Sequence, residues 1–127
     1  MKKYALMMVV LVASLSLTTG AFAGDKDAIK KQVDDIVMAI DSGKMVGEFK
    51  EAAYNKPYYV YILEESGNLL VHPTLAGQNL KEKAMPAYEA VTKATPEGTW
   101  VKYQWQGKEK NAYVRKTKSG AIVGSGY

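Results

Sequence analysis

Residues 58–73, with the sequence YYVYILEESGNLLVHP, carry the clearest structural pattern in the chain. The segment 58–63 is rich in aromatic and β-branched residues, which favour β-strands. Residues 64–68 contain the Ser-Gly-Asn sequence of a turn, and 69–72 form a second apolar segment that ends at Pro73. The pattern predicts a β-hairpin with strands at 58–63 and 69–72.

The chain that follows the hairpin predicts one helix and three more strands. Residues 74–80 are expected to form an ordered loop. A helix is expected over 80–94, with Pro86 kinking or restarting it because proline lacks the backbone N–H that an interior turn needs. Alternating patterns separated by glycine-containing turns predict strands at 99–105, 110–117 and 121–126.

The chain before the hairpin predicts two helices. Residues 25–42 place Ile29, Val33, Ile36, Val37 and Ile40 on one helical face and charged residues on the other. A second short helix is expected at 45–54, with Met45, Phe49 and Ala52 or Ala53 directed inward. The order of helix, helix, hairpin, helix and three-strand meander predicts an α+β fold, a mainly antiparallel sheet with its helices to one side.

The first 23 residues have the pattern of a secretory signal peptide. Lys2 and Lys3 precede an uncharged apolar segment at 4–17, and the Ala-Phe-Ala sequence at 21–23 is a typical cleavage site. We therefore expect export to the periplasm and a mature single domain of residues 24–127. The alternative is that the N-terminal segment remains uncleaved as a membrane anchor.

The composition argues against several classes of protein. The chain has no cysteine, which excludes disulfides, thiolate metal sites and iron–sulfur ligation. Its net charge is +4, but without Lys2 and Lys3 only 15 basic and 13 acidic residues remain, and the basic ones are dispersed, unlike a nucleic-acid-binding surface. No nucleophile, metal or cofactor motif is present, so we expect neither enzymatic activity nor a cofactor.

Blocks of sequence within the hairpin and after it resemble, in order and spacing, the Cache domain, and more narrowly the single-Cache extracellular sensors of bacteria. The blocks are YVYI at 59–62, SGNLLVHP at 66–73, LAGQNL at 75–80, GTWVKYQW at 98–105, KNAYV at 110–114 and IVGSGY at 122–127. The resemblance implies a PAS-like fold: a central antiparallel sheet of about five strands, a long N-terminal helix behind it and a ligand pocket on the other face.

The resemblance also sets an expectation about signalling. Cache domains usually sit between two transmembrane helices and are attached to a chemoreceptor, histidine kinase or cyclase. This sequence ends at Tyr127 with neither a second membrane helix nor an output module. We therefore expect a free-standing form whose bound state is read by a separate partner, such as a membrane receptor or a histidine kinase.

Tyrosine and tryptophan are the candidate pocket walls. The chain has nine Tyr and two Trp against two Phe, and the first two types combine an apolar body with a polar group that can orient a ligand. Tyr59 and Tyr61 share one face of their strand, as do Tyr103 and Trp105 of theirs. The alternative is that these faces belong to the core beneath the helices.

Four polar residues are candidates for anchoring a ligand. The resemblance places His72, the single histidine, at the pocket edge, where it can donate a hydrogen bond to an anionic or carbonyl oxygen; alternatively, it caps the strand end and satisfies a loop backbone group. Lys110 matches a lysine of the family pattern and would pair with a carboxylate, although it also flanks an exposed turn. Tyr113 is a further anchor, and Arg115 is a weaker candidate.

These observations lead to two hypotheses. In the first, the protein binds a small organic anion, such as a short carboxylate or an amino acid, the ligand class that the resemblance implies. In the second, the pocket is filled by aromatic side chains and the fold is an interaction scaffold, which docks on an envelope protein or forms a homodimer through the 25–42 helix.

Overall fold

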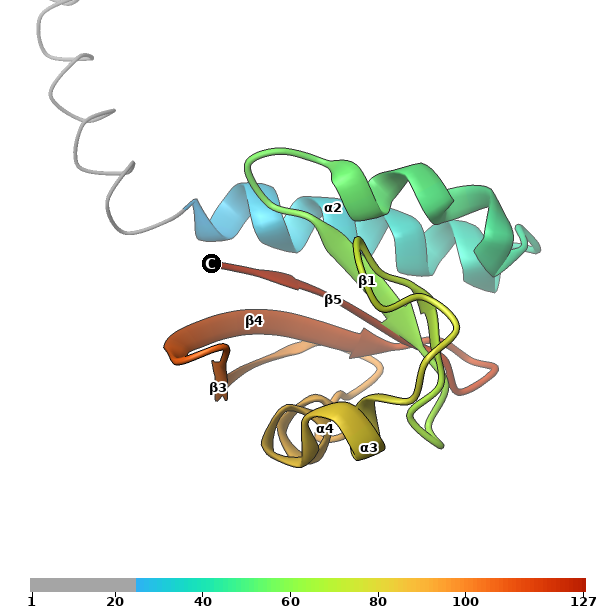
Figure 1. Cartoon of the computed structure of the whole chain (residues 1–127). Coiled ribbons are helices and arrows are strands. Elements are labelled where there is room, and N and C mark those ends of the chain that lie inside the picture. Colours follow the sequence, from blue (N-terminus) through green and yellow to red (C-terminus); the bar gives the residue numbers. More distant parts are fainter. Residues whose placement is uncertain (1–24) are drawn as a thin grey trace, which may run out of the picture.

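The computed structural model describes residues 25–127, which form a five-stranded antiparallel sheet with helices on both faces (Figure 1). The predicted signal peptide, residues 1–23, lies outside the described residues. The α+β class, the five strands and the long N-terminal helix of a PAS-like fold are confirmed. Within the described range, no helix has the length and apolar character needed to cross a membrane.

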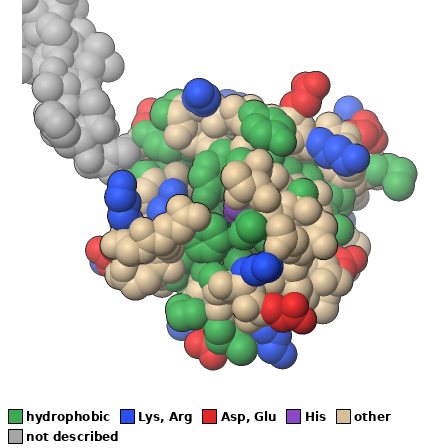
Figure 2. All heavy atoms as spheres, in the orientation of Figure 1, with side chains coloured by type: hydrophobic (Ala, Val, Ile, Leu, Met, Phe, Trp, Pro, Cys, Tyr) green, Lys and Arg blue, Asp and Glu red, His purple; other side chains and the backbone are tan. Residues whose placement is uncertain are grey.

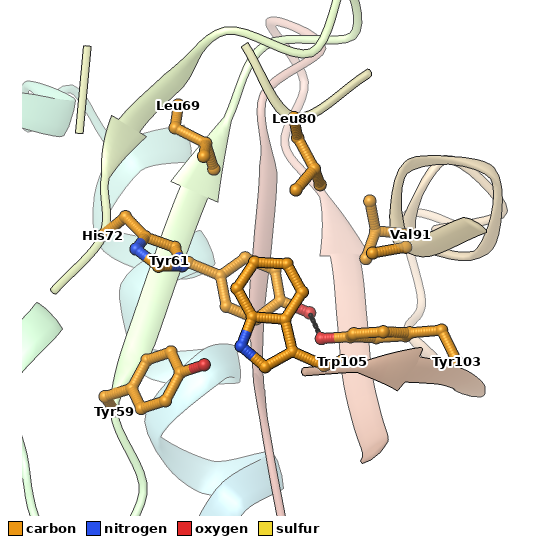
Figure 3. Close-up of a pocket in the computed structure, with 9 residues that line it drawn as sticks. Tyr59, Tyr61, Leu69, His72, Leu80, Val91, Tyr103 and Trp105 are labelled. Carbon is orange, nitrogen blue, oxygen red and sulfur yellow. Dashed lines mark hydrogen bonds between the residues drawn. The ribbon is translucent and has the colours of Figure 1, made fainter. Parts of the chain in front are cut away.

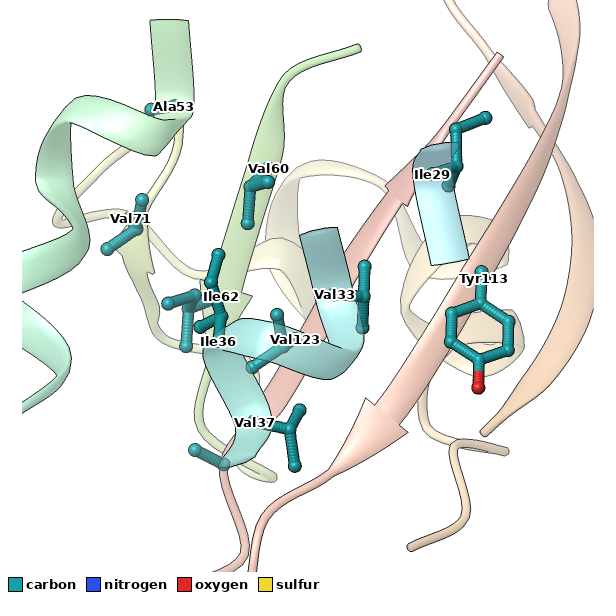
Figure 4. Packing of buried hydrophobic residues seen from close by; sticks show 11 residues of the cluster. Ile29, Val33, Ile36, Val37, Ala53, Val60, Ile62, Val71, Tyr113 and Val123 are labelled. Atoms are coloured by element: carbon teal, nitrogen blue, oxygen red, sulfur yellow. The ribbon is translucent and has the colours of Figure 1, made fainter. Parts of the chain in front are cut away.

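Helix α2 (Lys26–Asp41) begins after Asp25, whose carboxylate accepts a hydrogen bond of 3.0 Å from the backbone N–H of Ala28. Its predicted apolar face is buried against the sheet at Ile29, Val33, Ile36 and Val37 (Figure 4). Because this face belongs to the core, it is not a free surface for pairing with a second copy.

The second predicted helix is the 3₁₀ helix η1 (Val46–Tyr54). Ala53 is buried and Phe49 packs against the same core, as expected. The inward direction predicted for Met45 is wrong, since this residue is 71% exposed. Met45 has extended backbone dihedrals and precedes the first turn, so the helical periodicity does not extend to it.

The strands are β1 (Val60–Leu63), β2 (Leu69–Val71), β3 (Thr99–Trp105), β4 (Lys108–Lys116) and β5 (Ile122–Gly126). The predicted hairpin is confirmed as β1 and β2, although β1 starts two residues later than expected. The order across the sheet is β2-β1-β5-β4-β3. The last strand therefore lies at the centre and joins the hairpin to the β3–β4 pair.

Two short helices replace the single helix expected over 80–94. Helix α3 (Leu80–Lys83) is followed directly by α4 (Met85–Val91), and Pro86 lies in the first turn of α4. Proline is tolerated in a first turn, where its missing N–H has no helical partner, so Pro86 restarts the helix rather than kinking it.

The expectation that all helices lie to one side of the sheet is wrong. Helices α2 and η1 cover one face, whereas α3 and α4 pack on the other (Figure 1). The reason lies in the central strands, since all four residues of β1 are buried. A strand that is apolar on both faces needs cover on both, so the sheet separates two apolar clusters.

Candidate functional site

A small cavity lies between the sheet and the α3–α4 pair (Figure 3). The sheet side contributes aromatic rings and the helices contribute an apolar wall. The lining residues are Tyr59, Tyr61, Leu69, His72, Leu80, Ala87, Val91, Tyr103 and Trp105. The volume open to the centre of a water-sized sphere is ≈ 10 Å³, room for about one water molecule.

The aromatic residues converge because of strand alternation and two small residues. Tyr61 and Tyr103 come from β1 and β3, which β5 and β4 separate. The Tyr61 ring lies over Gly124 of β5, where an added Cβ would be 2.5 Å from the ring carbon that bears the hydroxyl. The buried Ala112 of β4 lies on the same side of the sheet. The ring therefore reaches across the sheet toward β3.

The hydroxyls of Tyr61 and Tyr103 meet at 3.1 Å, and Figure 3 shows this contact at the centre of the group. Burial raises the pKa of Tyr61 well above its usual value and that of Tyr103 to about 12, so both groups stay protonated at neutral pH. One hydroxyl donates to the other, whose own proton meets no acceptor among the described residues. That proton is available to a third group.

His72 lines the cavity and also holds the loop that follows β2. The residue is 7% exposed, and its ring centroid lies 5.8 Å from that of Tyr59 and 5.9 Å from that of Trp105. Its Nδ1 accepts hydrogen bonds from the backbone N–H groups of Thr74, at 3.1 Å, and Leu75, at 3.0 Å. Burial lowers the pKa of His72 to about 4. His72 therefore lines the cavity and caps the loop at the same time, so the two alternatives posed for it hold together.

Lys110 lies beside the cavity rather than in its lining. It is half-buried, and its Nζ is 5.3 Å from the centroid of the Tyr59 ring. It pairs with Tyr103 across the β3–β4 ladder. Burial lowers the pKa of its ammonium group. Lys108, which flanks the same turn, is exposed.

The structure does not bring Tyr113 or Arg115 to the cavity. The Tyr113 hydroxyl donates to Asp34 Oδ1, at 3.2 Å, and to the Glu97 carbonyl oxygen, at 3.0 Å, on the α2 side of the sheet. Arg115 Nη1 lies 3.0 Å from the same Asp34 oxygen. Side chains alternate along β4, and Tyr113 and Arg115 lie three and five positions after Lys110. These odd spacings place both residues on the face opposite Lys110.

The apolar wall was missed by the sequence reasoning. It consists of Leu69 from β2, Leu80 from α3, and Ala87 and Val91 from α4. A signal was present, because residues four positions apart, such as Ala87 and Val91, share a helix face. Nothing in that spacing identifies which sheet face the helix covers.

No metal centre was found in residues 25–127, since no three His, Cys, Asp or Glu side chains gather there in a way that could hold an ion. On the face shown in Figure 2, basic side chains are interspersed with acidic ones and form no patch of a single sign. The chemistry of the cavity is therefore that of aromatic faces, hydroxyl and imidazole groups, and one neighbouring ammonium group.

Comparison with known proteins identifies the fold. Neither a family model nor a curated protein matches the sequence. A methyl-accepting chemotaxis protein from Vibrio parahaemolyticus RIMD 2210633 is similar in structure, with a TM-score of 0.54, 14% sequence identity, and coverage of 89% of this chain and 94% of that chain. The PAS domain of an HTR-like protein from Haloarcula marismortui has a TM-score of 0.43, 12% identity, and coverage of 76% and 98%. The likeness to the chemotaxis protein extends over most of both chains and shows a shared fold, the PAS-like α+β arrangement described above.

Proposed function

We propose that this chain is an exported, sensor-type binding module whose ligand is a small organic anion, such as a short carboxylate or an amino acid. The observation that supports this most is the convergence on one cavity of four aromatic side chains and His72, with Lys110 at its edge. A mainly apolar pocket with a few polar groups is the usual form of a small-molecule site.

The charges around the cavity favour an anion. Among the described residues, no acidic side chain lines the cavity. Its polar lining consists of tyrosine hydroxyl groups, the Trp105 indole and His72. Lys110 places an ammonium group over the Tyr59 ring. A ligand carboxylate would leave water for a site with several donors and a nearby positive charge, which offsets its desolvation.

A ligand larger than a water molecule requires the cavity to open. Tyr61 and Leu69 are buried and held by the sheet, whereas Tyr59 and Trp105 are partly exposed. We therefore place the entrance on the side of Tyr59, Trp105 and Lys110, where side-chain rotation enlarges the cavity without breaking strand pairing.

The cellular part of the proposal follows from the predicted signal peptide. Export would place residues 24–127 in the periplasm, and a separate membrane receptor or histidine kinase would read the bound state. The cavity lies on the sheet face opposite α2, so α2 and η1 stay free of the ligand and available for such a contact.

Thermal unfolding of the purified protein against a panel of short carboxylates and amino acids tests the proposal. A ligand at about 100 times its Kd should add about 2.7 kcal/mol to the free energy of unfolding, which raises the midpoint by several degrees. Lys110→Met should weaken binding by about tenfold or more, because a hydrogen-bonded charge pair is lost.

Lys108→Met is the matched control, since it removes an exposed lysine from the same turn. The proposal predicts that Lys108→Met keeps the midpoint shift that Lys110→Met loses. Equal losses in the two variants would point to a diffuse effect of net charge and would exclude Lys110 as an anchor.

The cavity volume of ≈ 10 Å³ favours a second candidate, the interaction scaffold. In that case the aromatic rings are packing residues and no compound on the panel raises the midpoint. A homodimer would then need a surface other than the apolar face of α2, which the sheet already covers. Co-purification of a protein partner with no small molecule bound would support this function over the first.

A further inference from the structure

One nitrogen of the His72 ring is occupied by groups that can only donate hydrogen bonds. The backbone N–H groups of Thr74 and Leu75 both point at Nδ1, at 3.1 and 3.0 Å. A backbone N–H has no lone pair to offer, so Nδ1 must act as the acceptor and carry no proton. The Thr74 hydroxyl, at 3.5 Å, can act in either direction and does not alter this requirement.

The remaining proton of the neutral ring must then be on Nε2. Burial among Tyr59, Tyr61 and Trp105 disfavours the charged imidazolium, in agreement with the lowered pKa of this group. Figure 3 shows the far nitrogen of the ring directed toward the other side chains of the cavity. No described residue accepts a hydrogen bond from it.

We propose that the Thr74 and Leu75 amides lock His72 as the Nε2–H tautomer, so that the cavity presents a permanent donor and selects ligands by their acceptor atoms. The inference rests on the proposed function, since it specifies how that site would recognise its ligand. Thr74 and Leu75 act as positioning residues, because they act through His72 and do not touch the ligand.

The lock distinguishes classes of ligand that size alone would not. A free histidine can exchange its tautomers and accept from a donor ligand, whereas the locked ring can only donate. Lys110 also has no acceptor, so the two groups impose the same preference. Carboxylates and carbonyl compounds would therefore bind, and an amine of the same size, which brings only donors and a positive charge, would be rejected.

The tautomer can be measured directly because the chain has one histidine. Protein purified without a histidine tag and labelled with ¹⁵N-histidine would give one ring spin system in a long-range ¹H–¹⁵N correlation spectrum at pH 7. We expect Nε2 at the shift of a protonated ring nitrogen and Nδ1 at that of an unprotonated one. A spectrum of the Nδ1–H tautomer, of an averaged mixture or of the imidazolium would overturn the proposal.

Two substitutions separate the roles of the two nitrogens. His72→Asn retains an acceptor oxygen near the position of Nδ1 and removes the donor, whereas His72→Gln places an amide donor near the position of Nε2 and loses the loop cap. With acetate as the probe, His72→Asn should weaken binding by about tenfold or more. His72→Gln should retain more of the binding despite a lower melting midpoint.

Acetate and ethylammonium form a matched pair of probes for the selection of acceptors. Acetate should shift the Nε2 signal of the wild-type protein in a saturable way, and ethylammonium should not. A larger response to ethylammonium would overturn the selection by acceptor atoms. A locked tautomer that responds to no carboxylate would count against the proposed function while confirming the lock, so the two failures are distinguishable.

Discussion

At the scale of single residues, His72 ties the loop after β2 to the cavity. Its Nδ1 holds the Thr74 and Leu75 amides, and its ring contacts Tyr59 and Trp105. Protonation would make Nδ1 a donor and break both loop contacts. The protonation state of this one side chain is therefore linked to the stability of the folded chain.

This linkage predicts an acid-sensitive component of stability. The pKa of His72 is about 4 in the folded protein against an ordinary value of 6.5. Between these values the unfolded chain binds a proton that the folded chain does not. The contribution of His72 to the free energy of unfolding is therefore fully present above pH 6.5 and is lost as the pH drops toward 4. The loss is at most roughly 3 kcal/mol, and urea unfolding between pH 4 and pH 7 would measure it.

The control for this prediction is His72→Asn, which does not titrate. Asp34 also has a lowered pKa, because hydrogen bonds from Lys30 and Arg115 outweigh the opposing effect of burial. The stability lost when Asp34 is protonated is the same in the wild-type protein and in His72→Asn, so the difference between their pH profiles isolates the contribution of His72. Parallel pH profiles would show that His72 is not the group responsible.

At the scale of elements, strand β4 connects the two sides of the sheet. Lys110 faces the cavity side, whereas Tyr113 and Arg115 contact Asp34 of α2 on the other. Arg115 Nε also donates to the Pro96 carbonyl oxygen, at 2.7 Å, in the turn that precedes β3. The polar cluster around Asp34 therefore joins α2, β4 and the start of β3.

A double-mutant cycle on Asp34→Ala and Arg115→Met tests this connection. The two side chains are 21% and 20% exposed, so water screens their interaction only in part. We expect a coupling free energy of about 1 kcal/mol in urea unfolding. The Lys31–Asp35 pair of the same helix, 76% and 59% exposed, is the control and should show no resolvable coupling. Equal coupling in the two pairs would contradict a structural role for Asp34.

At the scale of the whole molecule, two apolar clusters share one sheet. Neighbouring residues of β1 and β5 contribute to opposite clusters, Ile62 and Val123 to the α2 side and Leu63 and Ile122 to the cavity side. Neither cluster can lose its packing without disturbing strands that the other requires. We therefore expect the domain to unfold in one cooperative step.

The two tryptophans report on the two sides separately. Trp100 packs against Tyr113 on the α2 side, and Trp105 lines the cavity. In Trp100→Phe and Trp105→Phe, the remaining tryptophan's fluorescence and the circular dichroism signal should give the same unfolding midpoint. Different midpoints within one variant would show that the sides unfold independently. A bound ligand should change the fluorescence of Trp105 and leave that of Trp100 unaltered.

Much of the fold followed from local patterns. The hairpin, the face shared by Tyr59 and Tyr61, and the buried stripe of α2 all depend on the strand and helix periods, which neighbouring residues express directly. Met45 was misplaced at the boundary of an element, where the period ends. Tyr113 was grouped with Lys110 although their odd spacing on one strand places them on opposite faces.

The amino-acid sequence by itself determined the strands, the helical faces and the aromatic residues available for a cavity, because these depend on contacts a few positions apart. Only the tertiary structure decided that β5 lies between β1 and β4, that Tyr61 reaches Tyr103 over Gly124, and that α4 closes the cavity. The physical reason is that strand order and helix placement depend on burying both faces of the sheet at once, a condition that no single segment contains.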